Sequence, residues 1–356
     1  MNPDIRQARS LRGFLKVVAA VTAASCLAAA CTVTPLRIPR LHRVHPTGRI
    51  LGVLAGPRFG VIEYAFSSRR SRAILLPEAP VGAFFVGRSP EFVAVTQSDG
   101  ESRLLAFSES GQTRPISSPL AVPLRPAGGP VADLLAVESC QGRQPIFVMS
   151  LPASNGSARP KEVARGCPAA LSPDGSLVAF SPDLASVWTA PVSGQGSPRP
   201  LVRLAGRKLL QSLGMRAPRI VAAAGMSWSQ AGLAVAAEGE GRFACVVVDP
   251  TGRIRVIPLG AARPTALSWS PNGKLLAFTE HDRTGDAVRT FDASSHRLRL
   301  AALALGKQLQ GLVWSPSGDA IVTLAGADRW LVVTPDGARV RSIVVPPGSI
   351  PFDWAS

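Results

Sequence analysis

The densest group of residues that could do chemistry in this chain is Glu280-His281-Asp282, with two carboxylates and an imidazole in succession. Oxygen and imidazole ligands of this kind hold metal ions in proteins, so the triplet could coordinate a cation. A metal site needs further ligands at a defined spacing, and the sequence offers no second cluster of them. We therefore predict no metal ion and no other cofactor, and interpret the triplet as part of a polar loop.

Catalytic motifs are missing from the rest of the sequence. The four histidines are His42, His45, His281 and His296. There is no Gly-x-Ser-x-Gly elbow, no His-Glu-x-x-His, no P-loop and no Cys-x-x-Cys. The sequence therefore predicts no catalytic residue and favours a binding protein over an enzyme.

The first 30 residues have the features of an export signal. An apolar run of small residues, Val17–Ala30, follows four basic residues, Arg6, Arg9, Arg12 and Lys16. The run is short and alanine-rich for a membrane span, but it suits the apolar region of a secretory signal. It ends in Leu27-Ala28-Ala29-Ala30-Cys31, which resembles the lipobox of bacterial lipoproteins. Leu27 stands one place further from the cysteine than the usual large apolar residue.

The lipobox resemblance implies cleavage before Cys31 and transfer of a diacylglyceryl group to its thiol. Residues 31–44 would then form a tether, and two or more lipid chains would anchor the protein stably. Two alternatives stay open: ordinary cleavage after Ala30, which gives a secreted protein, and an uncleaved anchor. We expect an exported protein held by lipid on the outer side of a bacterial membrane.

A repeat of about 42 residues runs through the rest of the chain, a period typical of propeller blades. Its clearest copies are Leu171–Gly175, Trp228–Gly232, Trp269–Gly273 and Trp314–Gly318. They follow the pattern Trp-Ser-Pro-x-Gly before an apolar run, with Leu171 in place of the Trp and Gln230 in place of the Pro. Aligning the apolar runs gives seven units, at His45, Gly87, Gly129, Ser172, Ser229, Ser270 and Ser315. Turn residues between short β-type runs recur with the same period and also give seven units, at Ser67-Ser68, Ser110-Gly111, Asn155-Gly156, Ser193-Gly194, Thr251-Gly252, Ser294-Ser295 and Asp336-Gly337.

One repeat is divided between the two ends of the chain. Phe352–Ser356 supplies only its first half, and His45–Val53 supplies the second. A ring needs its last strand beside its first, whereas a linear array does not. The sequence therefore predicts an all-β protein whose residues 45–356 form a seven-bladed β-propeller, with six blades as the alternative, closed by pairing of the N- and C-terminal strands.

The Trp-Ser-Pro-x-Gly units resemble the repeats of TolB-type propellers, which are related to WD-repeat proteins. The resemblance covers about His45 to Ser356 and is clearest in the last four blades. It implies a fold and no particular activity. TolB itself carries an α/β domain before a propeller of usually six blades, so the resemblance does not carry a Tol–Pal role to this chain.

Four strands per blade, A to D from the axis outward, assign each loop to one face of the propeller. The B–C loops and D–A connections share one face. Cys140 ends a B strand and Cys167 lies in the next D–A connection, so we predict a disulfide between them. Cys245 lies in an apolar strand and is expected in the core. A longer D–A connection, around Leu204–Arg219, could contain a short basic amphipathic helix that contacts a partner or lipid, or be a tolerated surface loop.

Acidic residues recur in the predicted B–C loops. They could form a face that binds a cation or a basic partner, although polar loops are generally rich in such residues. The members of this possible binding face are Asp99, Glu101, Glu138, Asp183, Glu238, Glu240, Glu280, His281, Asp282, Asp286 and Asp328.

The basic residues follow a different pattern. The net charge is +16, and arginines alternate along the predicted outer D strands, for example at Arg70 and Arg72. Charges on an exposed edge block pairing with other chains. The basic segments lack stacking aromatic residues, so we expect no nucleic acid partner.

We therefore predict a monomeric, non-catalytic binding or scaffold propeller at the cell envelope. Its expected partner is a protein or an envelope polymer. The alternative is a propeller enzyme of the lyase or lactonase type with a metal site at the channel mouth.

Overall fold

Short apolar runs between Gly- and Pro-rich turns form antiparallel β-strands along nearly the whole described chain. The computed structural model describes residues 46–55, 58–86, 91–108, 110–129, 131, 134–140, 144–151 and 159–356. By its internal contacts the chain divides into Met1–Val44 and His45–Ser356. The predicted signal segment, the tether and Cys31 lie outside the described residues.

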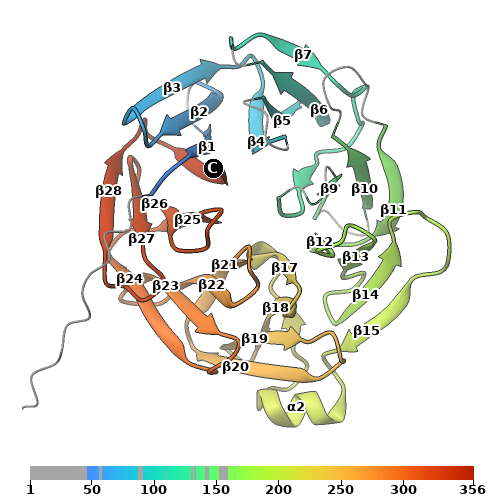
Figure 1. Ribbon diagram of the computed structural model, residues 1–356. Helices are drawn as coiled ribbons and strands as arrows, with labels where there is room; N and C mark the ends of the chain where they lie inside the picture. Colours follow the sequence, from blue (N-terminus) through green and yellow to red (C-terminus); the bar gives the residue numbers. More distant parts are fainter. Residues whose placement is uncertain are drawn as a thin grey trace, which may run out of the picture. The chain divides into compact units, whose positions relative to one another are not determined.

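Seven antiparallel sheets follow one another around a ring within His45–Ser356 (Figure 1). In the order A to D, the first three blades are β29 (Ser349–Ala355), β1 (Arg49–Leu54), β2 (Gly60–Ala65), β3 (Arg70–Leu75); β4 (Ala79–Phe85), β5 (Phe92–Ser98), β6 (Glu101–Phe107), β7 (Thr113–Pro115); and β8 (Arg125–Pro126), β9 (Leu134–Glu138), β10 (Pro145–Ser150), β11 (Lys161–Arg165). The predicted seven-bladed propeller is thus confirmed, and the six-bladed alternative is wrong.

The remaining four blades follow in chain order. They are β12 (Ala169–Leu171), β13 (Leu177–Phe180), β14 (Ser186–Pro191), β15 (Arg199–Arg203); β17 (Met226–Ser229), β18 (Gly232–Gly239), β19 (Arg242–Val248), β20 (Ile254–Gly260); β21 (Arg263–Trp269), β22 (Leu275–His281), β23 (Gly285–Asp292), β24 (Leu298–Leu305); and β25 (Leu309–Trp314), β26 (Ile321–Ala325), β27 (Arg329–Val333), β28 (Val340–Val344). In the fifth blade β16 (Arg219–Ile220) also pairs with β18, ahead of β17, so the inner strand is divided in two.

The Ser-Pro-x-Gly pattern forms the A–B turns for a definite reason. The Ser172 hydroxyl accepts a hydrogen bond from Leu177 N at 2.9 Å and donates one to Asp174 at 2.6 Å. Gly175 closes the turn with φ +71°, in the left-handed region that suits glycine. Ser270 accepts from Leu275 N at 3.0 Å in the same way, so the repeat encodes one turn structure.

Closure of the ring occurs where the divided repeat predicts it. β29 pairs with β1 in antiparallel register, with Trp354 opposite Ile50. The Trp354 indole N–H also donates to Thr47 O at 2.8 Å. In Figure 1 the C-terminus lies beside β1 at the inner side of the ring. The predicted pairing of the two terminal strands is therefore confirmed.

The hydrophobic core of the described chain is distributed between the blades. Each of seven buried clusters joins two neighbouring blades, and together they complete the circle. The cluster that joins the seventh and first blades contains Trp330 and Trp354. Because each sheet is covered on both sides by its neighbours, every blade depends on the ring for the burial of its apolar surface.

The long D–A connection between the fourth and fifth blades contains α2 (Arg207–Leu213), at the outer edge of the ring beside β20 (Figure 1). This confirms the predicted helix. Leu209 and Leu213 are buried in the cluster between these two blades, together with Met215. The apolar side of the helix is therefore covered by the protein itself. Among the described residues no helix has the length and hydropathy needed to span a membrane.

The basic residues of the outer edge are divided between strands and turns. Arg70 and Arg72 lie in β3, and Arg72 pairs with Glu63 of β2 at 2.9 Å. Arg253, Arg297 and Arg339 lie just before β20, β24 and β28 and not within these outer strands. The carbonyl oxygen of each arginine accepts a hydrogen bond from a backbone N–H at the end of the C strand, so these residues close the C–D turn. The donors are Asp249, Asp292 and Thr334.

A candidate binding site at the channel mouth

One face of the propeller carries the B–C loops and the D–A connections, and we call it the B–C face. It includes the B–C turns at Asp99-Gly100 and Glu240-Gly241 and the D–A connection Gly166–Pro168. A cavity of about 510 Å³ lies on this side, where the inner strands of the sixth, seventh and first blades begin. Its lining residues are Ala223, Arg263, Pro264, Thr265, Ala266, Thr279, His281, Asp286, Gln308, Leu309, Gln310, Gly311 and Ile350.

His281 and Asp286 form a pair at the edge of the cavity, opposite one another in the β22–β23 register. The Asp286 carboxylate is buried, contacts His281 Nδ1, and accepts a hydrogen bond from Leu309 N at 2.6 Å. The His281 side chain is 54% exposed. A carboxylate that is hydrogen-bonded to Nδ1 fixes the orientation of an imidazole and leaves Nε2 free to bond to another partner. His281 can therefore exchange a hydrogen bond with a ligand in the cavity.

Other polar groups line the same cavity. The hydroxyl groups of Thr265 and Thr279 lie 2.7 Å apart and bond to each other. Arg263 is the first residue of β21, and it forms no ion pair with any of the described residues. Gln308 and Gln310 are exposed on either side of Leu309. The cavity thus presents a guanidinium, an imidazole and two amides to a ligand.

The triplet Glu280-His281-Asp282 does not form one ligand set. Glu280 is buried and bonds to Arg289 on the neighbouring strand, whereas His281 pairs with Asp286. Asp282 accepts hydrogen bonds from Thr284 N and its hydroxyl at 2.7 and 2.6 Å, which lower the pKa of the Asp282 carboxyl. The two carboxylates of the triplet therefore bind separate partners and do not converge on one metal ion.

Most other acidic residues predicted on the B–C face form hydrogen bonds or ion pairs with nearby residues. Asp183 accepts from Ala185 N and Ser186 N at 2.9 Å each. Arginine contacts are made by Glu101 with Arg103 at 3.6 Å, Glu240 with Arg216 at 3.9 Å and Asp328 with Arg329 at 4.0 Å. Asp99 accepts from the Ser98 hydroxyl at 3.2 Å, and Glu238 lies within β18.

Five of the predicted loop carboxylates lie in strands, and three of these, Glu138, Glu280 and Asp286, are also buried. The other two are Glu101 in β6 and Glu238 in β18. The apolar pattern ended β9, β18 and β22 too early and began β6 and β23 too late, because it does not locate strand ends to within one or two residues.

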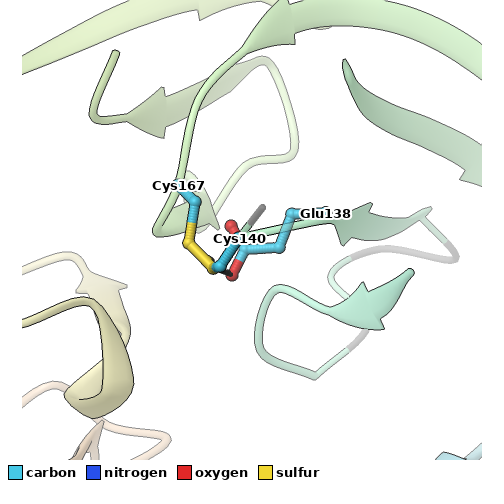
Figure 2. A group of neighbouring side chains, drawn as sticks. All are labelled: Glu138, Cys140 and Cys167. Atoms are coloured by element: carbon cyan, nitrogen blue, oxygen red, sulfur yellow. Dashed lines mark hydrogen bonds between the residues drawn. A yellow bond between two sulfur atoms is a disulfide. The ribbon is translucent and has the colours of Figure 1, made fainter. Parts of the chain in front are cut away.

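The structure contains the predicted disulfide between Cys140 and Cys167, with the two Cα atoms 5.2 Å apart. It lies on the B–C face between the third and fourth blades, and Glu138 lies against it (Figure 2). Arg125 Nη2 lies 2.8 Å from Cys140 Sγ and 3.3 Å from Glu138 Oε1. The sequence signal for Glu138 was its position two residues before Cys140, and nothing pointed to Arg125. The prediction that Cys140 ends the B strand is wrong, because β9 ends at Glu138 and Cys140 lies just beyond it. Cys245 is buried and unpaired, as expected.

The Arg125 side chain also connects this group to the cavity wall. Its Nη2 lies 3.3 Å from the carbonyl oxygen of Ala222, the first residue of the 3₁₀ helix η2 (Ala222–Ala224). The next residue, Ala223, lines the cavity. The disulfide and the cavity are therefore neighbours on one face.

No family model matches the chain, and no curated protein matches its sequence. Solved structures do match. A protein from Lactobacillus plantarum aligns with a TM-score of 0.56 and 16% identity, over 87% of this chain and 99% of its own. The fold is a β-propeller. An oligogalacturonate lyase in complex with manganese aligns over 78% of this propeller chain and 82% of its own, with a TM-score of 0.57 and 12% identity.

TolB from Acinetobacter baumannii aligns over 86% of this chain and 83% of its own, with a TM-score of 0.49 and 14% identity. The β-propeller fold that the resemblance to TolB-type repeats implies is confirmed by the seven blades of this structure. Likenesses at such identities concern the fold alone, so the function of this propeller must be argued from its own site.

Proposed function

We propose that this chain is a non-catalytic binding propeller of the bacterial cell envelope, anchored by lipid on Cys31, which holds its ligand at the channel mouth. The observation that carries the proposal is the cavity of about 510 Å³ on the B–C face. Ligand sites in proteins are commonly concave, with a few converging polar groups that fix the orientation of what they bind. The cavity meets both conditions.

The cavity chemistry favours an acidic or hydroxyl-rich ligand. The Asp286 carboxylate is already paired with His281 and Leu309 N. Arg263 is therefore the charged residue of the cavity lining that can bind a ligand. A guanidinium binds carboxylate or phosphate groups with two parallel hydrogen bonds. Gln308 and Gln310 can add neutral donors and acceptors. These groups match a cell-envelope polymer, or an acidic segment of a protein partner.

Photo-crosslinking in intact cells tests this proposal. A photoreactive residue in place of Gln310 is expected to capture a cell-envelope component. The same residue in place of Arg299, on the outer strand β24, is expected to capture none, since it lies away from the cavity. Capture at Arg299 with none at Gln310 would place the ligand elsewhere and refute the proposal.

A propeller enzyme is the second candidate, and the pair of His281 and Asp286 is the observation that favours it. An imidazole oriented by a carboxylate can accept a proton from a substrate. Elemental analysis of the purified chain is expected to find no stoichiometric calcium, manganese or zinc if the protein is a binding module. Turnover of an envelope polymer that His281→Ala abolishes would establish the enzyme instead.

A further inference from the structure

The two sulfurs of the Cys140–Cys167 disulfide are unequally accessible. Cys140 is exposed two residues beyond the end of β9, whereas Cys167 is buried with 6% of its surface exposed. A thiol that approaches from solvent can therefore reach Cys140, and Cys167 would be the sulfur released. This asymmetry is independent of what the cavity binds.

A cation lies against both sulfurs. Arg125 Nη2 is 2.8 Å from Cys140 Sγ and 3.6 Å from Cys167 Sγ. A neighbouring guanidinium stabilises a thiolate and lowers the pKa of the thiol, and a sulfur with a lower pKa leaves faster in exchange. The disulfide thus stands beside a group that would stabilise the charge formed when it opens.

A proton donor lies on the buried side of the disulfide. Glu138 Oε1 is 3.7 Å from Cys140 Sγ and 3.9 Å from Cys167 Sγ, and Glu138 Oε2 is buried with no hydrogen-bond partner among the described residues. Burial raises the pKa of the Glu138 carboxyl to about 7, against the lowering effect of Arg125. The group can therefore carry a proton near neutral pH and release it to a sulfur.

We propose that Cys140 and Cys167 form a thiol–disulfide exchange site that accepts two electrons from a dithiol on an exported protein partner. A partner thiolate attacks Cys140 Sγ, the bond to Cys167 Sγ breaks, and Glu138 protonates the Cys167 thiolate. A second partner thiol gives its proton to the Glu138 carboxylate and attacks the partner sulfur of the mixed disulfide. Cys140 then leaves as a thiolate beside Arg125, and the partner leaves with its own disulfide.

The alternative for the reduced form is a metal site, since Glu138, Cys140 and Cys167 place their ligand atoms within 4.8 Å of one another. Arg125 argues against it. Its guanidinium contacts both sulfurs and the carboxylate, so a second cation would meet a positive charge among its ligands.

The test is reduction of the folded full chain by dithiothreitol, followed by thiol labelling and mass spectrometry. We expect a second-order rate that sub-denaturing urea does not change, because reduction at an accessible site needs no unfolding. Glutathione should form its mixed disulfide at Cys140 and not at Cys167. A rate that rises with urea, or an adduct at Cys167, would make the disulfide a structural crosslink and overturn the proposal.

Variants test the two assisting groups. Arg125→Gln should slow reduction by about threefold to tenfold, because loss of the cation raises the pKa of the released thiol. Arg70→Gln, on the exposed strand β3, is the matched control and should leave the rate unchanged. If Arg125→Gln does not fold, Arg125→Lys keeps the charge and should retain the wild-type rate within about threefold.

Glu138→Gln tests the proton donor. In the wild type, the rate per partner thiolate should fall as the pH rises through about 7, where Glu138 loses its proton. This fall should be absent in Glu138→Gln. An unchanged pH profile, or stoichiometric zinc bound by the reduced protein, would also overturn the proposal.

Discussion

Asp353 shows how one carboxylate on the innermost strand can oppose the stability of the ring at neutral pH. Its carboxylate accepts hydrogen bonds from Phe85 N at 2.9 Å and Trp354 N at 2.8 Å. Burial nevertheless raises its pKa from 3.8 to about 6. The folded protein therefore holds a proton there more tightly than the unfolded chain does. Its contribution to stability is complete below pH 3.8 and is lost as the pH rises through about 6.

Asp353→Asn should remove this loss, because the amide carries no charge. Its single acceptor oxygen can keep the bond from Phe85 N and gives up the one from Trp354 N. We expect the free energy of unfolding at pH 7 to rise by about 2 kcal/mol, with little change at pH 3.5. Urea unfolding at both pH values measures it, with Asp99→Asn on an exposed turn as the control. A variant less stable than the wild type at pH 7 would contradict this explanation.

At the scale of residues, the sequence predicted a contact correctly where strand order alone brings two residues to the same face. Cys140 and Cys167 were paired because strand order brings their loops to one face. Arg125 could not be found, since it meets Glu138 only through the β8–β9 register, and β8 is two residues long. His281 was grouped with the wrong carboxylates for a similar reason. Its partner, Asp286, lies opposite it on the next strand.

Helix α2 is the element whose role the structure changes most. Its sequence is compatible with a helix that contacts lipid, but Leu209 and Leu213 pack inside the protein. Leu209→Ala should lower the free energy of unfolding by about 2 to 3 kcal/mol, the range typical of a buried leucine. Gln211→Ala, on the exposed side of the helix, should have little effect. If Leu209→Ala left stability unchanged, the packing described here would be wrong.

The strands themselves were predictable wherever the turn chemistry repeats. Ser172, Ser270 and Ser315 each accept a backbone N–H in an A–B turn, which explains why the pattern marks blade after blade. The divided inner strand of the fifth blade, β16 and β17, could not be predicted. The insert that produces it has no repeated pattern, and its path depends on contacts with the fourth blade, such as Ile220 N to Leu184 O.

At the scale of the whole molecule, the ring depends on its last strand. Phe352 packs against two inter-blade clusters and Trp354 lies in a third. Removing residues 352–356 should therefore lower the unfolding temperature sharply or prevent folding, because the loss of each aromatic side chain costs about 3 to 5 kcal/mol. Removing only Ser356, which is exposed, should change the temperature little. Calorimetry compares the two, and equal temperatures would refute closure by β29.

Membrane attachment is a prediction about the N-terminal segment and is independent of the ring. Cys31→Ala should release the protein from membranes, because the lipid chains would have no thiol to which they could be attached. Fractionation of cells, with Cys245→Ala as a control for loss of a cysteine, measures the effect. Retention of the Cys31→Ala protein in the membrane fraction would exclude lipidation there and favour an uncleaved anchor.

The central claim is that the channel-mouth cavity holds the ligand through Arg263 and its polar neighbours. The most direct measurement is the yield of the photo-crosslinked adduct at Gln310 in an Arg263→Gln background, compared with an Arg70→Gln background. We expect the yield to fall about tenfold or more in Arg263→Gln, as the loss of a charged hydrogen-bond partner implies, and to stay unchanged in Arg70→Gln. Equal yields in the two backgrounds would contradict the claim.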